Sequence, residues 1–134
     1  MREDEIRLLN KEIADARGGI MFHALMEHAR ESVEKLKKDF RPAECVRFES
    51  DTIWFKVSNI EYPAIWVEVR YDTRGVVIEA DTAQDATSFK KRSNVDRIEI
   101  GVDSSGEPHW AHHGKRLGSL DEVVRIIVAP IFRL

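Results

Sequence analysis

Residues 1–41 carry apolar side chains at intervals of three and four, the spacing of an amphipathic helix. Two such stripes follow one another out of phase. The first stripe consists of Ile6, Leu9, Ile13, Ala16 and Ile20. The second consists of Phe22, Met26, Ala29, Val33, Leu36 and Phe40. Because Gly18 and Gly19 lie near the change of phase, and two glycines in a helix cost about 2 kcal/mol relative to alanine, the pattern predicts a kink or break. We therefore expect an N-terminal helix, or a kinked helical pair, that ends before Pro42.

From Cys45 onward the apolar period changes to two residues, which indicates β-strands. Apolar and polar residues alternate through residues 45–81 and again from residue 98, as expected of an antiparallel sheet with one covered face. Ile53 and Phe55 are both expected on the covered face. Short turns such as Asp72–Gly75 join successive strands. The pattern predicts a five- to six-stranded antiparallel meander over residues 45–113, with residues 82–95 as its longest loop and a helical turn as an option at Ala83–Ala86.

The last segment reads as a helix over residues 119–131. Ser119 and Glu122 form a capping box, in which the serine oxygen accepts a backbone N–H and the glutamate reaches back to the serine amide. Pro130 lacks an N–H and is expected to end or kink this helix. The whole chain of 134 residues fits one α+β domain, residues 1–134, of ordinary size.

Composition narrows the class of protein further. The chain is 43% hydrophobic and carries a net charge of −3, so it can form a packed core but shows no strong basic excess. We therefore do not expect a nucleic-acid partner. No apolar run approaches the roughly 18–20 residues of a membrane span, and no secretory signal is recognisable. The single cysteine, Cys45, cannot form an internal disulfide, which favours a cytoplasmic location.

A histidine-rich segment near residue 110 is the first candidate site. On a strand, His109 and His113 would share one face, and Asp103 or Glu107 would add a carboxylate. Such a set can bind zinc or copper. The spacing matches no metal-binding motif, so the alternative is an exposed strand end with hydrogen-bonded histidines. We accordingly expect no metal and no cofactor.

The tryptophans Trp54, Trp66 and Trp110 are the second candidate. Trp54 and Trp66 alternate with the apolar residues of their strands, which places them together on the outer face of the sheet. Exposed aromatic patches mark interaction surfaces. If helices cover that face, the same side chains are core residues instead.

Two further surfaces remain open. The first helical stripe has the spacing of a coiled-coil seam but covers only about two heptads, fewer than the three or four of a secure coiled coil. It either forms a dimer contact or packs onto its own sheet, whereas the second stripe is expected to pack within the chain. Basic residues form either a phosphate-binding patch or a solvated loop: Lys90, Lys91, Arg92, Arg97, Lys115 and Arg116.

No sequence motif of an enzyme is present, and Cys45 with a histidine is a weak nucleophile–base candidate. We therefore lean away from catalysis. The leading hypothesis is a noncatalytic protein-binding or adaptor domain that self-associates, as a homodimer for example. The alternative is a small-ligand-binding protein or enzyme that uses a pocket between the sheet and the helices.

Overall fold

The computed structural model describes residues 2–40, 45–60, 64–83 and 91–132. Helix α1 (Glu3–Phe40) is followed by the sheet and then by helix α2 (Leu120–Phe132). The strands are β1 (Val46–Ser50), β2 (Trp54–Asn59), β3 (Ile65–Asp72), β4 (Gly75–Ala83), β5 (Lys91–Val102), β6 (Pro108–His112) and β7 (Lys115–Arg116). Each strand pairs antiparallel with the next, in the order β1 to β7.

The predicted α+β class and the antiparallel meander are confirmed. The described residues form seven strands rather than five or six, because Lys115 and Arg116, beyond the predicted sheet of residues 45–113, form the short strand β7. No helix in the described part of the chain combines the length and the apolar character that a membrane span requires.

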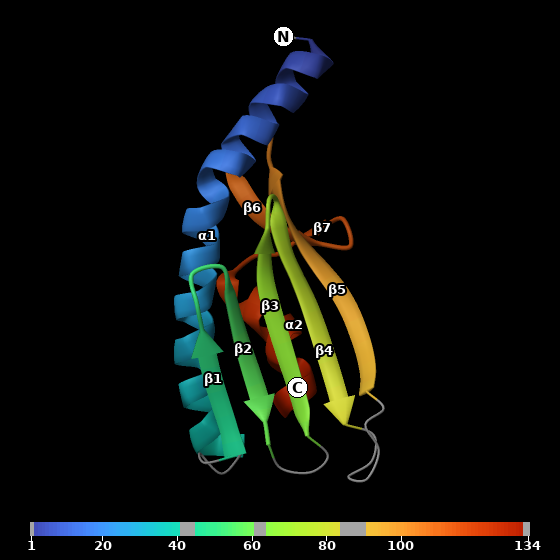
Figure 1. Ribbon diagram of the computed structural model, residues 1–134. Helices are drawn as coiled ribbons and strands as arrows, with labels where there is room; N and C mark the ends of the chain where they lie inside the picture. The colour runs from blue at the N-terminus through green and yellow to red at the C-terminus, as the bar shows by residue number, and fades with distance from the viewer. Residues whose placement is uncertain (1, 41–44, 61–63, 84–90, 133–134) are drawn as a thin grey trace.

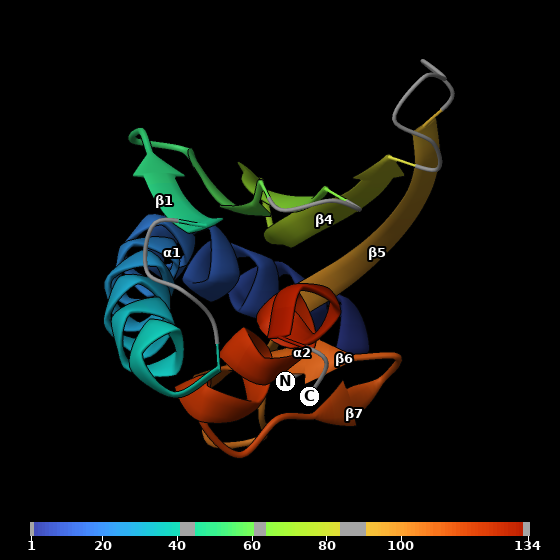
Figure 2. The same ribbon diagram turned by 90° about the horizontal axis from the view of Figure 1, so that it is seen from below.

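The two helices lie on the same side of the sheet. Viewed from below, strands β1 and β4 lie above α1 and α2, while β5 curves round to bring β6 and β7 to the other side of α2 (Figure 2). The sheet therefore wraps around α2, and α1 lies alongside (Figure 1). Within the described residues no helix covers the outer face of β1–β4.

The core forms where the second stripe of α1 meets the inner sheet face. Phe22 is buried against two aromatic side chains, with ring centroids 6.0 Å from Phe55 and 5.6 Å from Tyr71. Val33 of α1 and Ile127 of α2 are also fully buried. The predicted inner face is thus largely confirmed. Ile53 is the exception, because it lies in the β1–β2 turn and is 60% exposed.

Of the kink or break predicted near Gly18 and Gly19, the break does not occur. Helix α1 is one continuous helix of 38 residues, whose ribbon bends but does not break (Figure 1). Gly18 is buried, and a Cβ there would overlap the hydroxyl of Tyr71 on β3. The glycine therefore lets the helix approach the sheet closely, and packing against the sheet offsets the weak helix propensity of the pair.

The predicted loop over residues 82–95 is also too long. Strand β4 extends to Ala83 and β5 begins at Lys91, so that Asp81 pairs with Ser93 and Ala80 with Asn94. The suggested helical turn after Ala83 lies outside the described residues. The side chains in this part of the strands are polar, so the sequence shows no alternation of apolar and polar residues there. Alternation indicates burial of one face and does not indicate backbone pairing.

Helix α2 begins almost as predicted. The Glu122 N–H donates to the Ser119 hydroxyl at 3.4 Å, but the Glu122 carboxylate accepts from the Gly118 amide at 2.8 Å instead of the Ser119 amide. Pro130 does not end the helix, which continues to Phe132. Because Pro130 has no backbone N–H, the helix lacks one backbone hydrogen bond close to its end. Burial of Ile131 and Phe132 after the proline stabilises the last turn.

Candidate functional site

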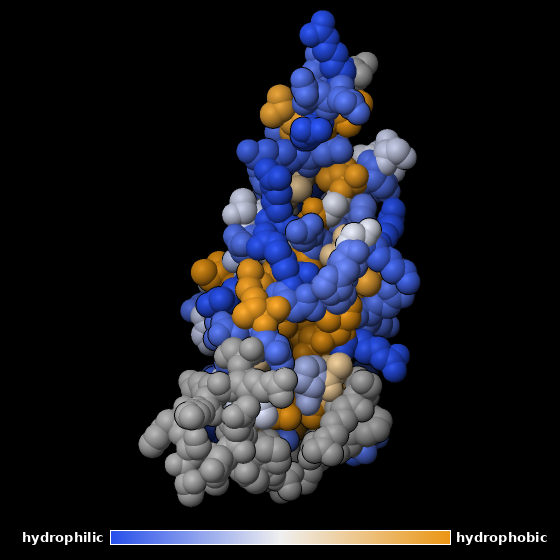
Figure 3. Space-filling view, turned by 90° about the vertical axis from the view of Figure 1, so that its right-hand side faces the viewer, coloured by the Kyte–Doolittle hydropathy of each residue, from blue (hydrophilic) through white to orange (hydrophobic). Residues whose placement is uncertain are grey.

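The N-terminal part of α1 projects beyond the sheet and carries exposed apolar side chains. A helix of 38 residues is about 57 Å long at 1.5 Å per residue, longer than any strand that it accompanies. Figure 1 shows its first turns extending past the strands. Ile6 and Leu9 are each 43% exposed and Ile20 is 67% exposed. Apolar surface also shows among the polar side chains of this projecting end in Figure 3.

The change of phase between the two stripes explains this exposure. One uninterrupted helix presents them on different faces, so the second stripe packs into the core, whereas the first lies beside the β5–β6 turn and is largely exposed. Ala14, Gly18 and Phe22 mark the buried face, whereas Ala16 and Ile20 are exposed. We name the outward stripe the α1 seam, which comprises Ile6, Leu9, Ile13, Ala16 and Ile20.

The α1 seam follows a heptad repeat. Isoleucine occupies all three a positions, Ile6, Ile13 and Ile20, while the d positions hold Leu9 and Ala16. The apolar seam then ends, because the following d and a positions of the heptad hold polar side chains: His23, Glu27, Arg30 and Glu34. The apolar seam is therefore confined to the first half of α1.

One side of the α1 seam borders a hollow of about 400 Å³. Its other wall is the β5–β6 turn, Val102–Gly106. Asp103 organises this turn: one of its carboxylate oxygens accepts from the Ser105 hydroxyl at 2.6 Å and from the Glu107 amide at 3.0 Å. These bonds, with a further contribution from Arg116, hold the pKa of Asp103 well below its ordinary value. The wall of the hollow is thus a well-bonded turn.

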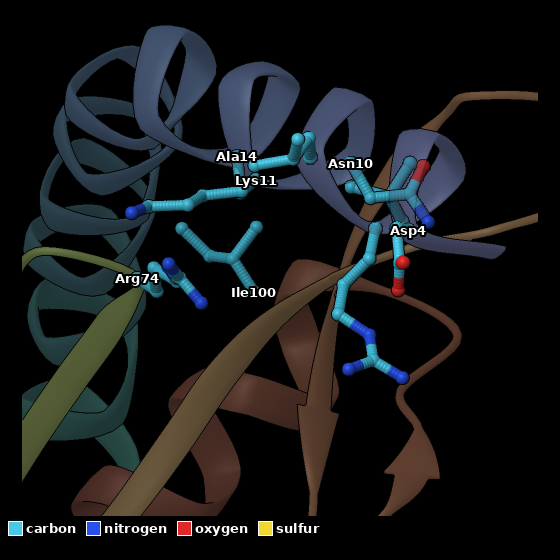
Figure 4. A pocket seen from close by; sticks show the side chains of 10 residues that line it. Asp4, Asn10, Lys11, Ala14, Arg74 and Ile100 are labelled. Atoms are coloured by element: carbon cyan, nitrogen blue, oxygen red, sulfur yellow. The ribbon is translucent and has the colours of Figure 1, made fainter. Parts of the chain in front are cut away.

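A larger pocket of about 560 Å³ lies on the other side of α1, between this helix and β5. Arg7, Lys11 and Arg74 line it together with Asp4, and Ile100 contributes apolar surface. In Figure 4 the nitrogen atoms of Lys11 and Arg74 lie at one end of the pocket and Asp4 lies at the other. Arg74 also contacts Asp15 of α1, with Nε 3.8 Å from the carboxylate. This pocket offers room for a small ligand between α1 and the sheet.

The three predicted tryptophans do not form one surface. Trp110 is buried in the core, so its assignment to an interaction surface is wrong. Trp54 and Trp66 are half-buried on strands β2 and β3. In the sheet register Trp54 lies opposite Arg70 and Trp66 opposite Ser58, with the pair Lys56 and Glu68 between them.

Charged side chains divide this outer face further. The Lys56 ammonium lies 6.0 Å from the ring centroid of Trp66, while Arg70 forms ion pairs with Glu68 and Glu79. The expectation that Trp54 and Trp66 lie together is therefore wrong, although they share a face as predicted. Charged side chains lie between and around the two tryptophans, so their surface is not a continuous apolar patch.

The histidines assemble differently from the predicted set. His109 lies across Gly101 of β5, and its Nδ1 is buried with no hydrogen-bond partner among the described residues. His113 instead lies beside His112, with ring centroids 4.0 Å apart. His112 Nε2 is 2.7 Å from a carboxylate oxygen of Asp96 on β5, and His113 Nε2 is 3.7 Å from the other oxygen.

Sequence reasoning missed Asp96 and His112. Neighbours on a regular strand point to opposite faces, so the strand pattern separates His112 from His113. The only local signal was the His113-Gly114 step, a sequence compatible with a tight turn. Asp103, a predicted carboxylate partner of His109 and His113, is engaged by the β5–β6 turn and by Arg116.

Two residues of the candidate basic patch are paired with carboxylates. Arg97 donates to Asp72 at 2.7 Å, and this pair lowers the pKa of Asp72. Arg116 donates to Asp103 at 3.1 Å. Lys90 lies outside the described residues, as do the side chains of Lys91 and Arg92. Cys45 is a half-buried free thiol.

Comparison of the chain with models of protein families, with curated proteins and with solved structures gives no match.

Proposed function

We propose that this chain is a noncatalytic binding domain that self-associates, and that the α1 seam pairs with the α1 seam of a second copy. The observation that supports this most is the exposure of a heptad-spaced apolar stripe on a helix that extends past its own sheet. Isoleucine at a with leucine at d favours two parallel strands in coiled coils. A second copy of the same stripe therefore fits the seam.

The charges beside the seam favour the parallel orientation. Glu12 occupies position g and Arg17 the following position e, so a parallel pair brings Glu12 of each copy beside Arg17 of the other. In an antiparallel pair equivalent flanking positions meet, and the two Glu12 side chains would repel. The polar residues His23, Glu27, Arg30 and Glu34, at the following d and a positions, end the contact. A seam of about two heptads supports reversible association rather than an obligate dimer.

The test is the double substitution Leu9→Glu and Ile20→Glu. Each change removes apolar burial of about 1.5–3 kcal/mol on each copy and places a carboxylate at the interface, so the dissociation constant is expected to rise on the order of 100-fold or more. Sedimentation analysis over a range of protein concentrations measures it. Ile53→Glu is the matched control, since Ile53 is 60% exposed but lies in the β1–β2 turn.

Orientation is tested separately by cross-linking. With Cys45 replaced by serine, Leu9→Cys is expected to form a disulfide-linked dimer on mild oxidation, because a parallel pair sets the two position-9 Cα atoms within reach of a disulfide. If sedimentation analysis found the wild-type protein monomeric at every concentration, the proposed pairing would be refuted. Cross-linking only when position 9 of one copy is combined with a cysteine at position 13 of the other would show an antiparallel pair.

The pocket between α1 and β5 supports a second candidate function, the binding of a small anionic ligand with an apolar part. Its volume of about 560 Å³ lies within the range of about 300–1,000 Å³ typical of ligand sites. Arg7, Lys11 and Arg74 supply positive charge, while Leu8 and Ile100 supply apolar surface.

An anionic aromatic probe, 8-anilinonaphthalene-1-sulfonate, tests this second candidate. The probe is expected to bind the folded protein with a gain of fluorescence, and the double variant Arg7→Gln and Lys11→Gln to weaken binding at least about tenfold, equivalent to 1.4 kcal/mol. Lys115→Gln, on the exposed strand β7, is the control. Equal binding by wild type and the double variant would exclude this pocket as the anion site.

A further inference from the structure

The β5–β6 region brings Asp96, His112 and His113 into one cluster that the self-association surface does not use. Asp96 lies on β5, two residues before the buried Ile98, and His112 lies two residues after the buried Trp110 on β6. Since Ile100 pairs with Trp110, Asp96 and His112 share the inner face of the sheet. Their side chains therefore converge across the two strands.

The turn between β6 and β7 adds His113. His112 pairs with Lys115, which leaves His113 and Gly114 as a two-residue hairpin loop. Their φ angles of +52° and +78° are those of a turn with two left-handed residues. A left-handed non-glycine residue costs about 1–2 kcal/mol. This conformation folds the His113 ring back onto the His112 ring. In a regular strand the His113 side chain would point to the face opposite His112.

The donor atoms have the composition of a transition-metal site. One Asp96 oxygen and one imidazole nitrogen from each histidine all lie within 4.8 Å of one another. Two imidazoles and a carboxylate suit Zn²⁺ and other divalent transition metals, with zinc bonds of about 2.0–2.2 Å. Neighbouring donors in a tetrahedral zinc shell are then about 3.3 Å apart. The His112 contact of 2.7 Å and the His113 contact of 3.7 Å are to different Asp96 oxygens, so side-chain rotations would bring one oxygen and the two nitrogens to this spacing.

The surroundings of the cluster favour a bound cation. The Arg97 N–H donates to one Asp96 oxygen at 2.8 Å and orients the carboxylate, as outer-shell donors do in metal sites. The His113 side chain is 77% exposed, so an ion can enter from solvent.

We propose that Asp96, His112 and His113 form a three-ligand site for a divalent transition metal ion, with Zn²⁺ as the best-fitting ion. Three protein ligands leave a fourth position for water, the arrangement of exchangeable zinc sites rather than closed structural ones. Hard ions such as Mg²⁺ and Ca²⁺ prefer oxygen ligands and are excluded by this donor set. The site corrects the set predicted from sequence, in which His113 was grouped with His109.

Calorimetric titration of ZnCl₂ into metal-free, tag-free protein tests the proposal. Wild type is expected to bind one Zn²⁺ per chain and to show no binding of Mg²⁺. His113→Asn is the principal variant, because asparagine tolerates the left-handed turn while it removes the imidazole. Loss of outer-shell partners already costs about 10–100-fold in affinity, so this loss of a ligand is expected to weaken Zn²⁺ binding by at least as much.

Two controls separate this site from other histidines. His109→Gln is expected to leave the Zn²⁺ affinity unchanged. If His109 and His113 formed the site instead, the same variant would bind Zn²⁺ more weakly. His23→Ala removes an exposed histidine on α1 and is also expected to have no effect. Cobalt in place of zinc should give the intense visible absorption of a four-coordinate ion in wild type and not in His113→Asn. Absence of Zn²⁺ binding to wild type up to millimolar concentration, or undiminished binding by His113→Asn, would overturn the proposal.

Discussion

Replacing Phe55 with alanine is expected to lower the free energy of unfolding by about 3–5 kcal/mol, the usual cost of removing a buried phenylalanine. Phe55 is fully buried on β2. Its ring stacks on Phe22 of α1, with centroids 6.0 Å apart, and on Phe48 of β1, with centroids 5.5 Å apart. The substitution therefore opens a cavity where the helix, the edge strand and the second strand meet, and none of these elements can collapse alone to fill it.

Urea denaturation followed by circular dichroism measures this change, at one fixed protein concentration because self-association adds to apparent stability. Ile53→Ala is the matched control. Ile53 lies two residues away in the sequence but is 60% exposed, so its loss is expected to change stability by no more than about 0.5 kcal/mol. Similar losses in the two variants would contradict the position of Phe55 at the junction of α1 and the sheet.

Phe55 and Ile53 also show what the sequence can predict of this fold. Both belong to the same alternating run, and periodicity assigns both to the covered face. The structure buries Phe55 and leaves Ile53 in a turn, because the pattern reports spacing and not where a strand begins. The meander and its inner face were predictable, since one-sided burial imposes alternation on most of its strands. The polar beginning of β5, from Lys91 to Asn94, was not, because backbone pairing alone leaves no apolar pattern.

Helix α1 shows a second limit on what the sequence pattern can predict. The two stripes and their change of phase were visible in the sequence, and the glycines offered a ready explanation as a break. The structure keeps the helix continuous, so the change of phase marks two different faces. A helical pattern gives the orientation of side chains around an axis but does not identify what each face contacts. Only the position of the sheet shows that Ile20 is left exposed while Phe22 is buried.

The histidine cluster depends on information that strand periodicity cannot supply. His113 faces the same way as His112 only because its φ angle is +52°, and Asp96 reaches them from a strand sixteen residues earlier in the sequence. Both the turn conformation and the β5–β6 register must be known before these three residues can be grouped. The prediction that Trp54 and Trp66 lie together failed for a related reason. The two side chains share a face, but the β2–β3 register places Lys56 and Glu68 between them.

Gly75 provides the sharpest test of the β4–β5 register, through the substitution Gly75→Ala. A Cβ at this position would overlap the carbonyl oxygen of Ile98 and lie 3.0 Å from the Cα of Glu99. Overpacking usually costs about 1–3 kcal/mol. Here the obstructing atoms belong to the backbone of a paired strand and cannot rotate away, so we expect a loss of about 3 kcal/mol in the free energy of unfolding.

The same substitution at Gly19 is the control and has the opposite expected sign. Nothing lies within 4 Å of a Cβ at Gly19, which is exposed on α1. Alanine there is expected to raise the free energy of unfolding by about 0.5–1 kcal/mol, through its better helix propensity. Equilibrium denaturation of both variants measures the difference. A neutral Gly75→Ala would show that β5 can shift away from β4, which would also unsettle Asp96, because the pairing that sets Gly75 against Glu99 also sets Ile78 against Asp96. The stability of one glycine variant therefore bears directly on the geometry of the proposed metal site.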